Sequence, residues 1–155
     1  MPSQKRPHNQ IQIFVLGKLI SYTLEGAKFF FLAVSRLIQK GYPIIIVHAG
    51  MEQNIYEVMR SVGFPSNHYL GLGQLSYEQA LMAATDADIC SVIINSEEGL
   101  STKVFDYIYL DRPIVAYAPK NSELEEVLLP AENAFICQET ESPAMAFAWW
   151  SSTRD

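Results

Sequence analysis

Apolar residues follow two alternating patterns along the chain. Short runs rich in Ile, Val and Leu alternate with longer segments whose apolar residues recur at helical spacing, and the alternation occurs six times between residues 11 and 150. A repeated strand and helix unit is typical of a parallel sheet whose strands are connected by helices. We therefore predict an α/β fold: a doubly wound, six-stranded parallel sheet of the Rossmann-like type, with strand order 3-2-1-4-5-6.

Six short apolar runs are predicted to be the strands. They are Ile11–Leu16, Ile44–Val47, a short strand around Tyr69 and Leu70, Ile89–Ile94, Ile114–Tyr117 and Ala134–Cys137. Each run is too short to cross a membrane, so we predict no transmembrane segment.

Helix signals separate the strands. The apolar residues between Ala27 and Ile38 form one helical face, and Gly41 follows as a residue that commonly ends helices. Ser76 and Gln79 are spaced as a capping box, in which each side chain bonds the backbone N–H of the other residue. This spacing predicts that a helix begins at Tyr77.

Composition and charge indicate one globular domain. Hydrophobic residues make up 49% of the 155 residues and charged residues 18%, which excludes a disordered chain. We assign the domain to residues 11–155 and interpret residues 1–10 as a polar tail or linker. The net charge of -6 disfavours nucleic acid and anionic lipid as partners, so any phosphate site must be built locally.

The cysteines and histidines predict structural roles. The first ten residues lack a secretory signal, so we expect a cytoplasmic, reducing location in which Cys90 and Cys137 are free thiols in separate strands. No grouping of His, Cys and carboxylates has metal-ligand spacing, so we predict no metal site. We expect His48 to be a hydrogen-bonded structural residue and His68 to be exposed.

Two loops are candidates for ligand binding. Ligands of doubly wound sheets bind beyond the carboxyl ends of the strands where the strand order reverses, commonly between strands one and four. The loop after strand one begins with Gly17 and Lys18, and the loop after strand four covers residues 95–103. The second loop leads into a helix, whose backbone N–H groups and positive dipole end attract phosphate.

The second loop carries residues suited to a phosphorylated sugar. Gly99 allows close approach of the backbone, and Glu98 can accept hydrogen bonds from sugar hydroxyls. Hydroxyl groups and a cation follow at Ser101, Thr102 and Lys103. The same residues would equally form an ordinary helix start, with Lys103 paired to a carboxylate one turn later. The spacing alone supports both interpretations equally.

The stretch from Glu98 to Ala116 resembles the donor-site signature of retaining GT-B glycosyltransferases of the glycogen synthase and glycosyltransferase family four type. In that signature two acids are separated by seven residues, and Gly-x-Pro precedes a valine-rich strand. The acids here are Glu98 and Asp106, and Arg112 replaces the glycine before Pro113, an exchange expected to affect only the surface. The resemblance extends over nearly the whole chain.

The resemblance implies that the chain is the C-terminal, nucleotide-sugar-binding domain of such an enzyme. Glu98 corresponds to the acid that contacts the donor sugar, and Asp106 to the acid that binds the ribose hydroxyls. Lys18 corresponds to the base that neutralises the diphosphate, and with Glu98 it forms the predicted catalytic pair. The implied donor-binding residues are Gly17, Lys18, Glu98, Gly99, Leu100, Ser101, Thr102, Lys103 and Asp106.

Three positions depart from the family pattern. Lys18 replaces an arginine, so a point charge takes the place of a bidentate group. Asp106 replaces a glutamate and is one methylene shorter. Glu25 stands where the family has a second diphosphate-binding lysine, and Lys103 would restore that positive charge.

The implied reaction is transfer of a sugar from a nucleoside-diphosphate sugar to an unknown acceptor, with the donor as substrate and no separate cofactor. Catalysis would depend on positioning and on stabilising the leaving diphosphate. The acceptor would bind an N-terminal domain that this chain lacks, so we expect little turnover by the chain alone and any attachment to the inner membrane through that domain. The alternative is a non-catalytic doubly wound module for nucleotide sensing or assembly.

Overall fold

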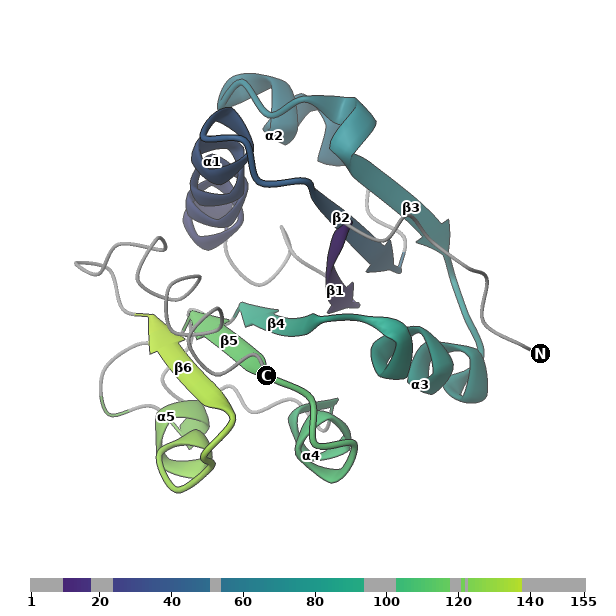
Figure 1. Ribbon diagram of the computed structural model, residues 1–155, viewed down its shortest axis with the longest axis vertical. Coiled ribbons are helices and arrows are strands. Elements are labelled where there is room, and N and C mark those ends of the chain that lie inside the picture. Colours follow the sequence, from purple (N-terminus) through teal and green to yellow (C-terminus); the bar gives the residue numbers. More distant parts are fainter. Residues whose placement is uncertain are drawn as a thin grey trace.

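The protein is a six-stranded, all-parallel sheet with helices on both faces (Figure 1). The computed structural model describes residues 10–17, 24–50, 54–93, 103–117, 121 and 123–137. The strands are β1 (Ile11–Leu16), β2 (Ile44–Ala49), β3 (Tyr69–Gly73), β4 (Ile89–Ile93), β5 (Ile114–Tyr117) and β6 (Ala134–Cys137). The helices are α1 (Leu24–Gln39), α2 (Ile55–Ser61), α3 (Tyr77–Asp86), α4 (Lys103–Tyr109) and α5 (Glu123–Leu128), with a 3-10 turn, η1, at Ser66–His68.

The strand order is β3-β2-β1-β4-β5-β6, which confirms the predicted doubly wound topology. The order reverses where β4 returns to pair with β1. Reciprocal hydrogen bonds secure this junction: the N–H of Gln12 donates to the carboxylate of Asp88 at 2.8 Å, and the N–H of Asp88 donates to the Gln12 carbonyl at 3.0 Å. β2 is two residues longer than predicted because His48 and Ala49 continue its pairing with β1.

Helices cover both faces of the sheet (Figure 1), and a cluster of buried apolar side chains lies on each face. α1 and α2 cover one face, where Phe31 packs edge-on against Phe64 with ring centroids 5.2 Å apart. α3, α4 and α5 cover the other face, where Tyr107 meets Phe14 of β1 at 6.5 Å. The rings of Phe14 and Tyr107 are both buried, so α4 packs closely against β1.

The capping box predicted for α3 is present. The hydroxyl of Ser76 accepts from the N–H of Gln79, and the Gln79 side chain accepts from the N–H of Ser76. The helix then packs against the sheet through two small residues, Ala80 and Ala84, which are both buried. Small residues on this face allow α3 to lie close to the sheet.

Arg112 has a structural role that the sequence did not indicate. Its guanidinium donates to the backbone carbonyls of Thr85 at 3.0 Å and Ala87 at 2.9 Å. These carbonyls lie at the end of α3, where helix hydrogen bonds run out. The expectation that Arg112 affects only the surface is therefore wrong, because its side chain joins the start of β5 to the end of α3.

The cysteine prediction is confirmed where the structure describes the thiol. Cys90 lies in β4, is fully buried and is a free cysteine. Burial raises the pKa of the Cys90 thiol to about 12, and the positive charge of Arg112 opposes this only in part. Cys137 ends β6, as predicted, but its side chain lies outside the described part of the chain.

Candidate functional site

The candidate crevice lies beyond the carboxyl ends of β1 and β4, where the strand order reverses. Gly17 directly follows β1, and α4 begins at Lys103, after the loop that leaves β4. Tyr107 of α4 connects these two parts. Its ring packs on Phe14, and its hydroxyl lies beside the backbone N–H of Leu16. Leu16, which precedes Gly17, therefore lies beside Tyr107, which follows Asp106.

The hydroxyl of Tyr107 is unusual for a buried group. Its side chain is almost fully buried, and the hydroxyl has no hydrogen-bond partner of acceptable geometry among the described residues. Burial raises the pKa of Tyr107 well above its ordinary value, and the nearby N–H of Leu16 acts weakly in the opposite direction.

The backbone of Gly17 is tightly constrained. Its φ of +88° lies in the left-handed region that favours glycine. The N–H of Gly17 donates to the Ala49 carbonyl at 2.7 Å, so this N–H is committed to β2. A Cβ placed on Gly50 would lie 2.8 Å from the Gly17 oxygen. The ends of β1 and β2 thus pack backbone against backbone, and a side chain at Gly50 would clash with Gly17.

His48 confirms the expectation of a hydrogen-bonded structural residue. The ring is fully buried in β2; Nδ1 lies 2.7 Å from the Tyr69 hydroxyl, and Nε2 is hydrogen-bonded to the Gly17 carbonyl. The expectation for His68 was wrong. His68 is half-buried in η1, and its Nδ1 donates to the Ile44 carbonyl at 2.7 Å, because η1 folds back over the start of β2.

Asp106 lies in the first turn of α4 and is half-buried. The hydroxyl of Tyr77, the first residue of α3, donates to Asp106 Oδ1 at 2.8 Å. This hydrogen bond to a carboxylate raises the pKa of Tyr77 above its ordinary value. Sequence reasoning missed Tyr77, since only the packing of α3 beside α4 brings the two side chains together.

The structure describes only part of the predicted donor site. It places Gly17 and Asp106 at the same edge of the sheet, one on each side of the contact between Leu16 and Tyr107. The remaining predicted residues lie outside the described residues, namely Lys18, Glu98, Gly99, Leu100, Ser101 and Thr102. The backbones of Lys103 and Glu25 belong to α4 and α1, but their side chains are not described. The roles assigned to these residues stay predictions.

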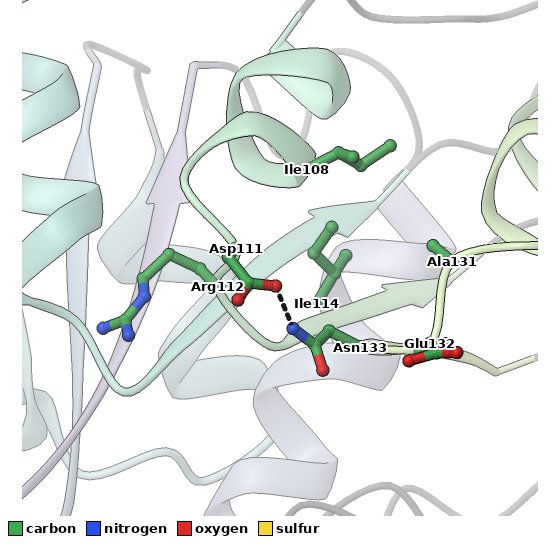
Figure 2. Close-up of a pocket in the computed structure, with 7 residues that line it drawn as sticks. All are labelled: Ile108, Asp111, Arg112, Ile114, Ala131, Glu132 and Asn133. Carbon is green, nitrogen blue, oxygen red and sulfur yellow. Dashed lines mark hydrogen bonds between the residues drawn. The ribbon is translucent and has the colours of Figure 1, made fainter.

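A depression of about 340 Å³ lies at the start of β5, at the opposite edge of the sheet from the crevice (Figure 2). Its lining includes Asp111, Glu132 and Asn133, and Asn133 donates to the Asp111 carboxylate. Figure 2 shows the Arg112 side chain extending away from Asn133 and Glu132, and its guanidinium donates to the Thr85 and Ala87 carbonyls. Arg112 also lines the depression, but its guanidinium is hydrogen-bonded to backbone carbonyls at the end of α3, and the two carboxylates would repel a diphosphate. This depression is therefore a poorer nucleotide site than the crevice.

The described residues form neither a metal site nor a membrane-spanning helix. Among them, no group of three or more His, Cys, Asp and Glu residues is arranged to hold a metal ion. None of the helices in the described part of the chain is long and apolar enough to cross a membrane.

Comparison of the sequence with protein families and with curated proteins gives no match. Solved structures are similar in fold. Anabaena HepE in complex with UDP-glucose has a TM-score of 0.65 and 16% identity, over 95% of this chain and 40% of HepE. WaaG, a glycosyltransferase involved in lipopolysaccharide biosynthesis, has a TM-score of 0.65 and 10% identity, over 90% of this chain and 36% of WaaG. UDP-GlcNAc 2-epimerase from Methanocaldococcus jannaschii has a TM-score of 0.64 and 12% identity, over 89% of this chain and 38% of the epimerase.

These similarities define the class of fold. The chain has the Rossmann-like architecture of one half of a GT-B protein, and it spans about two fifths of the length of the proteins it resembles. At such low sequence identities the comparison shows the fold alone, because doubly wound sheets host many functions.

Proposed function

We propose that this chain is the donor-binding, C-terminal domain of a GT-B glycosyltransferase and that it binds a nucleoside-diphosphate sugar at the carboxyl ends of β1 and β4. The observation that best supports this is the packing of α4 against β1 through Tyr107 and Phe14. It brings Gly17 and Asp106, two residues of the donor-site resemblance, to one edge of the sheet. That edge is the usual ligand site of the fold.

The proposed binding mode follows from the chemistry of the two loops. Asp106 accepts hydrogen bonds from the ribose hydroxyls, and the backbone from Gly99 to Lys103 receives the diphosphate at the start of the helix. Lys18 offsets the negative charge of the diphosphate, and Glu98 contacts the sugar. Catalysis then consists of positioning the donor and stabilising the leaving diphosphate.

The acceptor side of the reaction is assigned to a second domain. In this proposal residues 11–155 form the donor domain, and residues 1–10 are a tail or linker. A second, N-terminal domain supplies the acceptor site, so the chain alone binds the donor but transfers little sugar. The location proposed for this activity is cytoplasmic.

A non-catalytic nucleotide-sensing or assembly module is the second candidate. It is favoured by the acid at Glu25 and by the point charge of Lys18. The similarity to an epimerase adds that proteins of this fold are not confined to sugar transfer.

Titration of the chain with UDP, GDP, ADP and their sugars, followed by ligand-observed NMR and calorimetry, tests the proposal. We expect one diphosphate to bind in a salt-sensitive manner. Asp106→Asn should weaken binding by about tenfold, because it removes a charged acceptor from the ribose. Glu25→Lys should strengthen binding by restoring a positive charge.

Glu132→Gln is the matched control for Asp106→Asn, since it neutralises an exposed acid at the opposite end of the sheet. It should leave nucleotide affinity unchanged. Absence of binding in the wild type and in Glu25→Lys would refute the donor-site proposal. Binding that survives Asp106→Asn unchanged would refute the assignment of the ribose to Asp106.

A further inference from the structure

A chain of hydrogen bonds through the buried His48 ring links β3, β2 and the residue that follows β1. It runs from the Tyr69 hydroxyl to Nδ1 of His48, at 2.7 Å, and from Nε2 of His48 to the carbonyl of Gly17. The His48 side chain has no solvent exposure. A buried polar ring is tolerated when its nitrogens are hydrogen-bonded, and both ring nitrogens of His48 have partners.

The direction of these bonds follows from the acceptor at one end. A carbonyl oxygen can only accept, so Nε2 of His48 carries a proton and donates it to Gly17. In the neutral ring Nδ1 then has a free lone pair, and the Tyr69 hydroxyl donates to it. Tyr69 therefore selects the His48 tautomer that holds Gly17.

His48 completes the constraint on the Gly17 peptide. The Gly17 N–H is held by Ala49, and the backbone of Gly50 packs directly against the Gly17 oxygen. An apolar side chain at position 48 would leave the carbonyl of the half-buried Gly17 without its side-chain donor. Among the described contacts, the Gly17 backbone would then be held by the Ala49 carbonyl and by packing against Gly50.

We propose that His48 is a positioning residue for the diphosphate: by holding the Gly17 carbonyl, it fixes the backbone at the carboxyl end of β1, the edge of the sheet where the diphosphate is proposed to bind. This inference rests on the proposed function. It assigns His48 no contact with the ligand and no role as a base. Its effect reaches the ligand only through the Gly17 backbone.

The test compares UDP with uridine, because only UDP carries the diphosphate. Both are titrated by calorimetry and NMR into the full wild-type chain, His48→Leu and His48→Gln. We expect His48→Leu to weaken UDP binding by about fivefold, the size of one lost hydrogen bond, and to leave uridine binding nearly unchanged. His48→Gln should recover most of the loss, because its amide N–H can again donate to the Gly17 carbonyl.

His68→Leu is the matched control. His68 also donates to a backbone carbonyl, that of Ile44, but at the start of β2 and away from Gly17. The control should lower stability without changing UDP affinity. Tyr69→Phe is a second, milder variant, should His48→Leu fail to fold. It keeps the ring that packs on Phe31 and should weaken UDP binding by about twofold through the loss of tautomer control.

Nitrogen-15 NMR of the His48 ring gives a reading that does not depend on any ligand. We expect the His48 ring of the wild type to have a protonated Nε2 and an unprotonated Nδ1. The opposite tautomer, or equal losses of UDP and uridine affinity in His48→Leu, would overturn the inference. Unchanged UDP binding by a folded His48→Leu chain would overturn it while leaving the proposed function intact. A wild type that binds no nucleoside diphosphate would refute both.

Discussion

The hydroxyl of Tyr77 donates a hydrogen bond to Asp106 Oδ1 at 2.8 Å, although 29 residues separate the two side chains in sequence. Tyr77 begins α3 and Asp106 lies in the first turn of α4, so the bond joins the starts of two helices on one face of the sheet. Tyr77 is mostly exposed, and its hydroxyl occupies one oxygen of the carboxylate proposed to bind ribose.

The Tyr77–Asp106 bond predicts a role for Tyr77 in ribose recognition. Tyr77→Phe should weaken UDP binding by about threefold, because the Asp106 carboxylate loses the donor that orients it. The loss should be smaller for 2′,3′-dideoxy-UDP, which lacks the ribose hydroxyls. Calorimetric titration of both nucleotides measures the difference. Tyr109→Phe, in an exposed position on the same helix as Asp106, is the control. An equal loss for both nucleotides would exclude coupling through the ribose.

Gly50 and Gly63 offer a matched pair for the close approach of the β1 and β2 ends. Both have a positive φ, but a Cβ on Gly63 would meet no atom within 4 Å, whereas one on Gly50 would lie 2.8 Å from the Gly17 oxygen. Gly63→Ala should lower the free energy of unfolding by about 1 kcal/mol, the ordinary cost of left-handed backbone. Gly50→Ala should cost at least about 2 kcal/mol and also weaken UDP binding. Urea unfolding measures both, and equal costs would contradict the observed contact.

The hydrogen bonds of Arg112 to the end of α3 predict an effect on stability at a position far from the crevice. Arg112→Met keeps much of the side-chain length but removes the donors to the Thr85 and Ala87 carbonyls. Unfolding free energy should fall by about 1 to 2 kcal/mol, because charged donors at a helix end contribute that much. Arg60→Met, on the exposed side of α2, should change it little. UDP affinity should be the same in both variants, and a stability change no larger than that of Arg60→Met would contradict the capping role.

The buried thiol of Cys90 predicts a loss of stability in alkaline solution. The unfolded thiol ionises near its ordinary pKa of 9.0, whereas burial raises the folded pKa to about 12. Between these values the unfolded chain binds fewer protons than the folded one, so the free energy of unfolding falls as pH rises. The contribution of Cys90 to this slope is about 1.4 kcal/mol per pH unit.

Cys90→Ala isolates that contribution, because other groups titrate equally in both proteins. The stability difference between wild type and Cys90→Ala, measured by urea unfolding on either side of pH 9, should change with pH in favour of the variant. A difference that stays constant with pH would contradict a buried, un-ionised thiol. Thiol-reactive reagents should modify Cys90 only after unfolding, since the native group is both inaccessible and protonated.

Local signals in the sequence determined the sheet. Parallel strands covered on both faces are mostly apolar, so the runs Ile11–Leu16, Ile114–Tyr117 and Ala134–Cys137 could be assigned with their observed bounds. The capping box of Ser76 and Gln79 was equally readable, because its bonds join residues three apart. The strand order then followed from the handedness of the connections.

The site depended on contacts that no local pattern encodes. The sequence pointed to Gly17 and Asp106 as neighbours of a ligand, but it gave no sign that Tyr77 would bond Asp106. His48 was expected to be satisfied, yet only the folded sheet assigned Gly17 as its partner, because 31 residues separate them. Arg112 was expected to affect only the surface, and only the tertiary structure places its side chain at the end of α3. Hydrogen bonds between distant residues form only when packing brings strand ends and helix ends together, and that placement is a property of the tertiary structure.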